Sequence, residues 1–180
     1  SERLFLYKEI GSLDTEQSRK AIEIPAQKLH VSYSAEAVKK ITELSKGYPF
    51  FIQQLCQLVF DHASDQVITL DDVNAVIPGF FQVLDNGFFK VRYERCSDAD
   101  RRFIFAMVAC GTLPCTISNI AKIMKKPVGS ISTARAQLIS KGIIYSVKYK
   151  ELDFTVPEFS GFIQRLDEYQ EWLKTEHLIK

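Results

Sequence analysis

The side chains best suited to chemistry in this sequence lie between Thr116 and Lys150. Five lysines there could each meet a phosphate group, and hydroxyl and amide side chains lie among them. They are Lys122, Lys125, Lys126, Lys148 and Lys150, together with Ser130, Ser132, Thr133 and Gln137. Ammonium groups attract phosphates, and hydroxyl or amide groups add hydrogen bonds to phosphate oxygens. This combination is typical of a surface that contacts a nucleic-acid backbone.

The charge distribution supports the same interpretation. The net charge is only +1, and residues 1–95 hold 11 Lys or Arg against 13 Asp or Glu. Between Arg101 and Lys150, however, there are nine Lys or Arg and no acidic residue, although the chain has 22 acidic residues in all. Such a one-sided segment favours a polyanionic partner. The alternative is that the lysines form a merely solvated face.

The sequence lacks the usual catalytic and metal-binding patterns. It contains no GxxxxGK[ST], GxGxxG, HExxH or GxSxG motif, and its three histidines are far apart. Its four cysteines form no CxxC pair. We therefore expect this segment to contain no catalytic residue and no metal site, and to be no enzyme by itself.

Length and composition indicate an ordinary globular protein. The 180 residues suffice for one large domain or two small ones, and 46% of them are hydrophobic. No run approaches the ~18 apolar residues that a membrane span needs, so we expect no membrane association. The chain starts without an initiator Met or a signal-peptide pattern, and its cysteine usage favours a reducing compartment. A fragment of a cytoplasmic protein is the expectation.

Capping residues and periodicity predict how the basic residues are positioned. Thr116 is a good N-cap for one helix, and Ser130 is a good N-cap for a second helix that ends at Gly142. The following residues alternate in polarity and predict two strands, over residues 143–147 and 152–156, around a basic tip. Helix, turn, helix and β-hairpin in this order predict a winged-helix module.

Helical geometry divides the second of these helices into two faces. At about 100° per residue, Ile131, Ala134 and Leu138 fall on one buried face, and Arg135 falls at its edge. The exposed face then consists of Ser132, Thr133, Ala136, Gln137 and Ser140. This face has no Arg or Asn that could form a bidentate contact with a base. We therefore expect binding mainly through phosphates, with weak sequence preference and marked salt dependence.

The first half of the chain is also predicted to be helical. Asp14 and Ser34 are expected N-caps, and Pro49 opens a helix that is apolar on nearly every face and should be a buried spine. Pro78 should interrupt the helix that follows Thr69, before a Phe-rich helix reaches about Tyr93. A strand-like segment is expected over residues 4–10, and a single last helix after Pro157.

One stretch resembles a known family. The residues Leu-Ser-Lys-Gly-Tyr-Pro-Phe-Phe-Ile-Gln at 44–53 follow a capped helix and precede a second capped segment at 68–73. This arrangement resembles the helical lid of P-loop ATPases, and the most similar group is the prokaryotic, archaeal-type ATPases of the AAA+ and STAND classes. In these a nucleotide-binding core is followed by such a lid and then by a winged helix. Residues 4–13 resemble the segment that leaves the last strand of the core.

The resemblance implies a nucleotide near this turn. In the family the Gly-x-Pro turn approaches the adenine base, which implies a cofactor-binding role for Tyr48 and Pro49, with ATP or ADP bound in the full-length protein. The core with its Walker motifs is not in this sequence. Many lids, including those of the initiator ATPases that recognise replication origins, carry an arginine after this turn, whereas residues 50–54 here contain none. A plain helix boundary is the alternative interpretation of the turn.

Together these observations predict a mostly α fold. We expect a helical lid-like domain over residues 1–77, a helical connector over 78–96, and a winged-helix domain with a small β-hairpin wing and a C-terminal helix over 97–180. The expected function is binding of double-stranded DNA through phosphates, coupled to the nucleotide state of an ATPase core in the same polypeptide.

Two other functions stay open from the sequence. In the first, the winged helix is an autoregulatory module that docks on the ATPase core or on a partner protein. Docking predicts an exposed apolar patch, for which the candidates are Phe80, Phe81, Phe88 and Phe89. In the second, the chain is a free-standing winged-helix regulator with a helical sensor domain.

Overall fold

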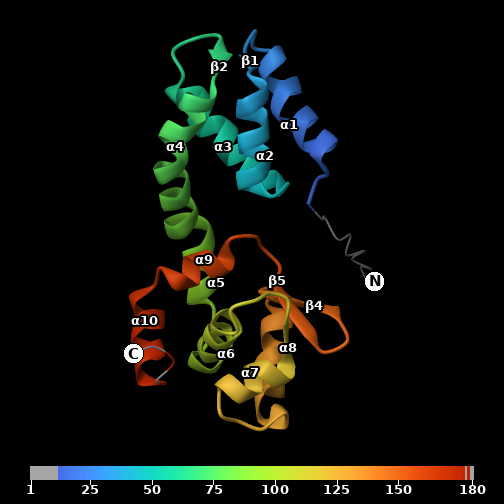
Figure 1. Ribbon diagram of the computed structural model, residues 1–180, viewed down its shortest axis with the longest axis vertical. Coiled ribbons are helices and arrows are strands. Elements are labelled where there is room, and N and C mark those ends of the chain that lie inside the picture. The colour runs from blue at the N-terminus through green and yellow to red at the C-terminus, as the bar shows by residue number, and fades with distance from the viewer. Residues whose placement is uncertain (1–11, 177, 179–180) are drawn as a thin grey trace, which may run out of the picture. The chain divides into compact units, whose positions relative to one another are not determined.

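The computed structural model describes residues 12–176 and 178, and it is mostly helical with two small sheets (Figure 1). The expected mostly α fold with a small β-hairpin is therefore confirmed. The strand expected over residues 4–10 lies outside the described residues. The chain divides into two compact units, which we call unit 1 (Ser1–Gln82) and unit 2 (Val83–Lys180). Within the described residues, no helix combines the length and apolar character that crossing a membrane requires.

Unit 1 consists of helices and one pair of very short strands. The helices are α1 (Thr15–Gln27), α2 (Ala35–Ser45), α3 (Pro49–His62) and α4 (Leu70–Val83), and the last of these ends one residue past the unit. Strands β1 (Ser32–Tyr33) and β2 (Val67–Ile68) pair in parallel.

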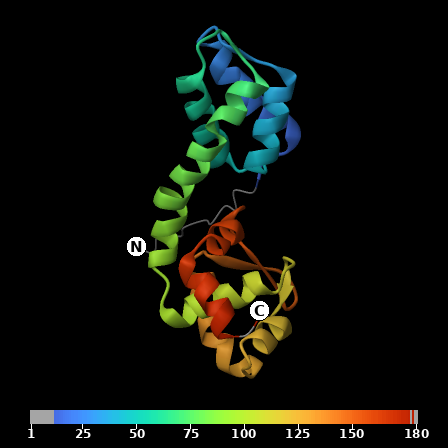
Figure 2. The same cartoon turned by 60° about the vertical axis from the view of Figure 1, so that its left-hand side comes forward.

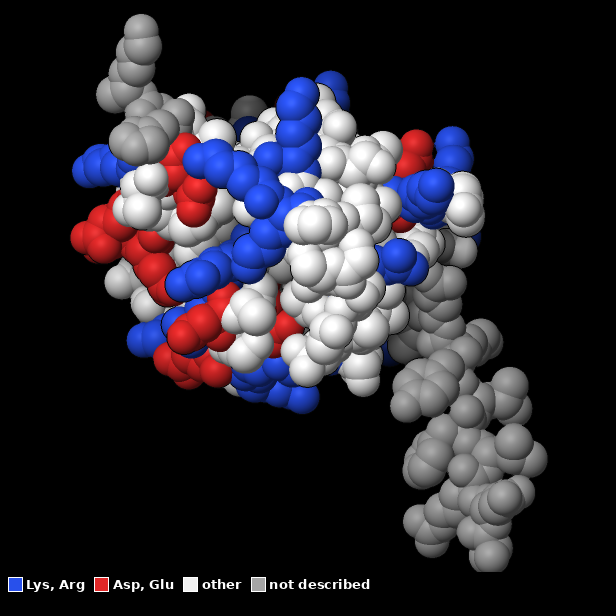
Figure 3. Space-filling view, turned by 90° about the horizontal axis from the view of Figure 1, so that it is seen from below, with Lys and Arg blue, Asp and Glu red and all other residues white. Residues whose placement is uncertain are grey.

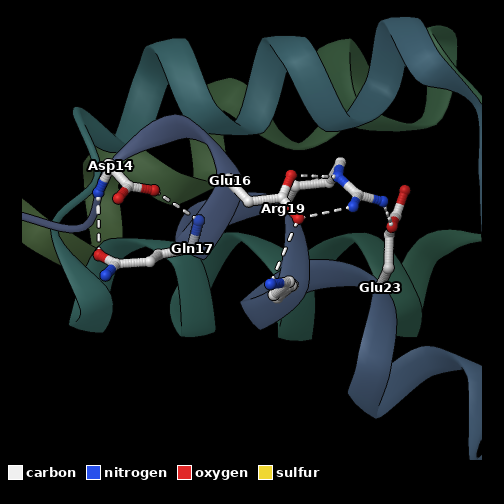
Figure 4. Close-up of polar contacts among 6 residues, drawn as sticks. Asp14, Glu16, Gln17, Arg19 and Glu23 are labelled. Atoms are coloured by element: carbon white, nitrogen blue, oxygen red, sulfur yellow. Dashed lines mark hydrogen bonds and ion pairs between the residues drawn. The ribbon is translucent and has the colours of Figure 1, made fainter.

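Helix α1 begins with the cap that its sequence predicts. The Asp14 carboxylate accepts a hydrogen bond from the Gln17 amide at 2.7 Å, and the Gln17 side chain accepts one from the Asp14 amide at 3.2 Å (Figure 4). On the same helix, Arg19 forms ion pairs with Glu16 and Glu23. Exposed pairs of this kind contribute little stability, so the reciprocal cap decides where the helix starts.

Helix α3 forms much of the core of unit 1. Phe51 is fully buried and packs edge-on against the rings of Tyr48, at a centroid distance of 4.9 Å, and of Phe80 from α4, at 5.9 Å. Phe50 and Phe60 are each 41% exposed, so the prediction of a spine buried on nearly every face is wrong at these two positions. The buried side chains of the helix, which include Phe51, Leu55 and Val59, lie on one of its sides, and Phe50 and Phe60 lie on the other.

Helix α4 continues through Pro78, where the sequence predicted an interruption (Figure 2). It is followed by a π-helical segment η1 (Leu84–Phe89) and by α5 (Lys90–Glu94). A proline inside a helix removes one backbone hydrogen bond. The carbonyl group left without a donor is that of Asn74, four residues earlier, and Asn74 is exposed, so water can bind it. The burial of Phe80 two residues later keeps the helix in place.

Unit 2 combines helices with a three-stranded antiparallel sheet. After α5 come α6 (Asp98–Ala109), β3 (Cys115–Thr116), α7 (Ile117–Ile123), a 3-10 turn η2 (Val128–Ile131) and α8 (Ser132–Ser140). Strands β4 (Ile144–Lys148) and β5 (Glu151–Phe154) form the hairpin, and the sheet order is β3-β5-β4. The chain ends with α9 (Phe159–Gln164) and α10 (Asp167–Thr175).

The single last helix expected after Pro157 is two helices. Leu166 has an extended backbone conformation, with φ −75° and ψ 131°, and this separates α9 from α10. Just before it, the Arg165 guanidinium binds both carboxylate oxygens of Asp85 at 2.6 and 2.8 Å. Asp85 lies 80 residues before Arg165, so the periodicity of the C-terminal residues could not predict this ion pair.

Two of the four phenylalanines predicted as a docking patch are fully buried, so the predicted patch is wrong at Phe80 and Phe89. Phe80 packs on Phe51 in unit 1. Phe89 packs on Phe159 and Phe162 in unit 2, with centroid distances of 5.8 and 5.5 Å. These rings help to form the two cores instead of an exposed surface.

Gly47 occupies a position that excludes other residues. It lies between α2 and α3 with φ +70°, and its carbonyl accepts a hydrogen bond from the Leu13 amide at 2.8 Å. A Cβ atom at this position would lie 2.2 Å from the Leu13 carbonyl oxygen. A side chain there would meet both backbone strain and a backbone clash.

We predict that Gly47→Ala destabilises unit 1 by more than about 2 kcal/mol, since it adds left-handed strain to the clash with Leu13. Gly79→Ala is the matched control, because Gly79 lies inside α4 and a Cβ atom added there would have no neighbour within 4 Å. It should leave stability unchanged or raise it by up to about 1 kcal/mol. Thermal unfolding followed by circular dichroism measures both. Equal melting temperatures for the two variants would contradict the prediction.

Candidate nucleic-acid interface

Helix α7 and the turn before α8 present the first predicted site residues. Thr116 caps α7 as predicted, because its hydroxyl oxygen accepts a hydrogen bond from the Asn119 amide at 3.2 Å. Ser130 was predicted to cap the second helix, and this is wrong. Its hydroxyl donates to the Pro127 carbonyl at 2.8 Å, since residues 128–131 form the 3-10 turn η2 and α8 begins only after it.

The end of α8 is fixed by backbone hydrogen bonds. Gly142 has φ +66°, as its predicted capping role requires. Its amide donates to the Ile139 carbonyl, and the Ile143 amide donates to the Leu138 carbonyl, both at 3.0 Å. These two bonds form a Schellman motif.

Lys141 attaches this end of α8 to the start of α6. Its ammonium group donates to the Asp100 carboxylate at 2.6 Å and to the Arg95 carbonyl at 2.9 Å. Asp100 is fully buried and also accepts hydrogen bonds from the amide and hydroxyl of Ser97. Lys141 is not among the site residues predicted from the sequence, because nothing local indicates that its partner lies 41 residues away.

The electrostatics of Asp100 reflect these donors. Burial by itself raises the pKa of its carboxyl group, but the hydrogen bonds from Lys141 and Ser97 outweigh burial and hold the pKa below its ordinary value. The carboxylate is therefore charged at neutral pH, and it stabilises the position of α8 in that form.

The exposed face of α8 is the one predicted from helical geometry. Ile131, Ala134 and Leu138 are buried, and Arg135 is half-buried. The predicted outer face is exposed at each position, namely Ser132, Thr133, Ala136, Gln137 and Ser140. The three predicted site residues of this helix, Ser132, Thr133 and Gln137, thus lie on one exposed face.

The β-hairpin is tied to α7. The Ile117 amide donates to the Lys150 carbonyl at 3.0 Å, and β3 pairs with β5 just before α7. Lys148 ends β4 opposite Glu151, so the tip contains Tyr149 and Lys150. The observed strands differ by one or two residues at each end from the predicted ranges, and their pairing has a register irregularity between Ser146 and Lys148.

The lysines of this region differ in their partners. Within the described part of the chain, Lys122, Lys126, Lys148 and Lys150 are exposed and form no ion pair with a carboxylate. Lys125, expected to be free, instead pairs with Glu176 at 3.2 Å. Figure 3, which views unit 2 from the side where α7 lies in Figure 1, shows Lys and Arg side chains gathered in a band. The candidate nucleic-acid interface is the surface formed by α7, the outer face of α8, and Lys148 and Lys150 of the hairpin tip, and it is rich in lysine.

The predicted nucleotide-binding residues belong to unit 1. Tyr48 is the N-cap residue of α3 and Pro49 its first residue, and both are half-buried. The turn is therefore the boundary between α2 and α3, as the alternative interpretation expects. Binding of adenine by Tyr48 and Pro49 stays a prediction. In the residues that the structure describes, no group of three or more His, Cys, Asp or Glu side chains is placed to hold a metal ion.

Comparisons with known proteins give one family match. Residues 86–163 match a family described as a domain of unknown function (DUF8462). No curated protein matches the chain. Two solved structures of RuvB from Thermotoga maritima, a mutant and the Holliday junction branch migration motor, match with TM-scores of 0.40 at 16% and 15% identity. Each match covers 92% of this chain and 50% of the other, so the chain spans about half of their length. Scores of this size do not establish a common fold.

We predict that Lys141→Met destabilises unit 2 by about 3 kcal/mol, because it leaves the buried Asp100 carboxylate without its cation. Lys122→Met, at an exposed position on α7, is the control and should change stability by less than about 0.5 kcal/mol. Urea unfolding at neutral pH measures both. A similar small change in both variants would show that the Lys141 contact does not hold α8.

The same pair predicts a dependence of stability on pH. The pKa of Asp100 is lower in the folded than in the unfolded protein, so its contribution is present above pH about 4 and is lost as pH falls below that value. Asp100→Asn should therefore be less stable at pH 7 and should lose less stability than the parent between pH 7 and 3. The control is Asp98→Asn, an exposed position in the same turn. Parallel pH curves for parent and Asp100→Asn would contradict the role of the carboxylate.

Proposed function

We propose that unit 2 is a winged-helix module that binds double-stranded DNA mainly through its phosphates. Its elements follow one another as helix, strand, two helices and a hairpin, with the first strand beside β5, and this order is typical of winged helices. The observation that carries the proposal is the exposed, lysine-rich surface formed by α7, the outer face of α8 and the lysines of the hairpin tip. Four lysines there form no ion pair among the described residues.

The chemistry of this surface suits phosphates better than bases. In the proposed complex α8 lies in the major groove, where Ser132, Thr133 and Gln137 meet the DNA, and the hairpin lies along the backbone. One amide and several hydroxyls give few specific base contacts, and the half-buried Arg135 is poorly placed for one. The expected binding is therefore weakly dependent on sequence and strongly dependent on salt.

Lys125 has a secondary role in this proposal. Its ion pair with Glu176 joins two side chains that are 64% and 32% exposed, and such pairs contribute at most about 1 kcal/mol. A DNA phosphate could replace Glu176 as its partner. The four lysines without a carboxylate partner need no such exchange, so they are the main phosphate contacts that we propose. Ser130 lies beside them on the exposed turn η2 and adds a hydroxyl group.

We further propose that the full-length protein is a cytoplasmic ATPase. The resemblance of residues 44–53 to an ATPase lid supports this, with a nucleotide-binding core in the same polypeptide and ATP or ADP near Tyr48 and Pro49. The segment itself would be no enzyme, and it would transmit the nucleotide state to DNA. The sharp turn at Gly47 presents Tyr48 and Pro49 at the half-exposed start of α3, where a ligand could reach them.

Protein docking is the second candidate function. The burial of Phe80 and Phe89 removes half of the patch on which it was based. In unit 2 the exposed large apolar side chains of η2, α8 and the hairpin are Tyr149, which is 87% exposed, and Val128, Ile139, Tyr145 and Val147, which are 38–44% exposed. They are compatible with a small protein contact, but the exposed lysines around them favour a polyanion. We therefore rank docking below DNA binding.

A charge-removal experiment tests the DNA proposal. The variant replaces the four lysines of the candidate interface that form no ion pair, as Lys122→Gln, Lys126→Gln, Lys148→Gln and Lys150→Gln. The control removes the same charge from unit 1, as Lys20→Gln, Lys28→Gln, Lys39→Gln and Lys40→Gln. Fluorescence anisotropy with unrelated labelled duplexes gives the affinity at several salt concentrations. The unit 2 variant should bind far more weakly, and its slope of log K against log salt should fall by about 0.9 for each phosphate that it no longer neutralises.

The outcomes separate the two candidate functions. Loss of binding in the unit 2 variant with normal binding in the control supports the DNA interface. Equal weakening in both variants would show a general charge effect and would overturn the assignment of the surface. No binding by the parent chain at low salt would exclude DNA as the partner of this segment and would leave protein docking.

A further inference from the structure

The tip of the hairpin exposes an aromatic ring that the proposed phosphate contacts do not use. Tyr149 is 87% exposed, whereas the next most exposed large hydrophobic side chain in the described residues, Leu29, is 60% exposed. Its sequence neighbours are Lys148 and Lys150. An aromatic side chain in this position is a large apolar surface that no part of the described protein covers.

The structure also fixes the turn that carries this ring. Lys148 pairs with Glu151 across the hairpin, and the Lys150 carbonyl accepts the hydrogen bond from Ile117 at the start of α7. Lys150 has the left-handed φ of +64° that closes the tight turn. Its ammonium group lies 4.9 Å from the centroid of the Tyr149 ring. The backbone that carries the ring is thus held at a defined place beside the candidate interface, and the Lys150 cation lies over the ring.

The chemistry of this tip fits one part of DNA better than others. Bases inside a duplex stack on one another, so they offer an approaching ring only their edges. An unpaired base next to a duplex offers a free face, and stacking of a base on an aromatic ring is strong and tolerant of sequence. The two flanking ammonium groups are suited to the phosphates on either side of such a base.

We propose that Tyr149 stacks on an unpaired base beside a duplex, so that the preferred ligand is a duplex with a single-stranded extension. This inference rests on the proposed binding of the duplex by α7, α8 and the lysines. It adds the class of DNA structure that the site selects. The tip meets the first unpaired nucleotide, while α8 remains on the paired region.

Three labelled DNAs test the preference: a blunt duplex, the same duplex with a short single-stranded extension, and the extension strand alone. The parent chain should bind the extended duplex about 5-fold or more tightly than the blunt duplex. Tyr149→Ala should reduce this ratio to that expected for the added phosphates alone, while its affinity for the blunt duplex stays within about 2-fold of the parent. Tyr149→Phe keeps the ring and should keep the ratio.

Two further measurements control the experiment. Tyr145→Ala removes an exposed tyrosine from β4 of the same hairpin and should leave the ratio unchanged. A 2-aminopurine at the first unpaired position should lose fluorescence when the parent or Tyr149→Phe binds, but not when Tyr149→Ala binds, because stacking quenches this base. Anisotropy reports affinity and the 2-aminopurine signal reports stacking, so the two readouts are independent.

The results distinguish this inference from the proposed function. Tight binding of the blunt duplex with no gain from the extension would overturn the inference and leave the proposed function intact. The inference would also be overturned if Tyr149→Ala keeps the parent ratio of affinities. It would be overturned as well if Tyr149→Phe loses that ratio, because the hydroxyl group and not the ring would then make the contact. Absence of binding to all three DNAs would overturn both.

Discussion

The geometry of unit 2 depends on one buried carboxylate. Asp100 is fully enclosed at the start of α6, and the removal of a charge from water costs several kcal/mol unless donors surround it. Ser97 supplies two donors from its own helix start, and Lys141 supplies a third from the end of α8. All three bind Oδ2, and among the described residues Oδ1 has no hydrogen-bond partner, so the cation is the main compensation for burial. Any shift of α8 away from α6 would leave this charge without its cation. The outer face of α8 therefore keeps its orientation because a charge behind it has to remain paired.

Features decided within a few residues could be predicted from the sequence. The caps at Asp14 and Thr116 and the left-handed glycine at Gly142 follow from side chains and carbonyls that are close in the chain. The faces of α8 follow from helical periodicity alone. For the candidate interface this was enough to place the exposed side chains of the helix and most of the exposed lysines.

Features decided by distant residues could not be predicted. The ion pair of Lys125 with Glu176 and the contact of Lys141 with Asp100 span 51 and 41 residues. Phe89 was predicted to be exposed because the packing of α9 on its ring is not visible in the local sequence. Ser130 is a good N-cap by type, but the 3-10 turn uses the local backbone differently. In each case the missing information was the conformation or packing of the folded chain.

The hydrogen bond between Ile117 and Lys150 has a consequence for the entropy of binding. A hairpin tip without such an anchor samples many conformations, and a ligand that selects one of them must offset the lost freedom. Here the turn is already joined to Ile117, the first residue of α7. Next to the turn, β3 pairs with Glu151 and Leu152 of β5. The tip thus loses its freedom during folding, so little further ordering opposes its contacts. The hairpin acts as a preorganised extension of the helical scaffold.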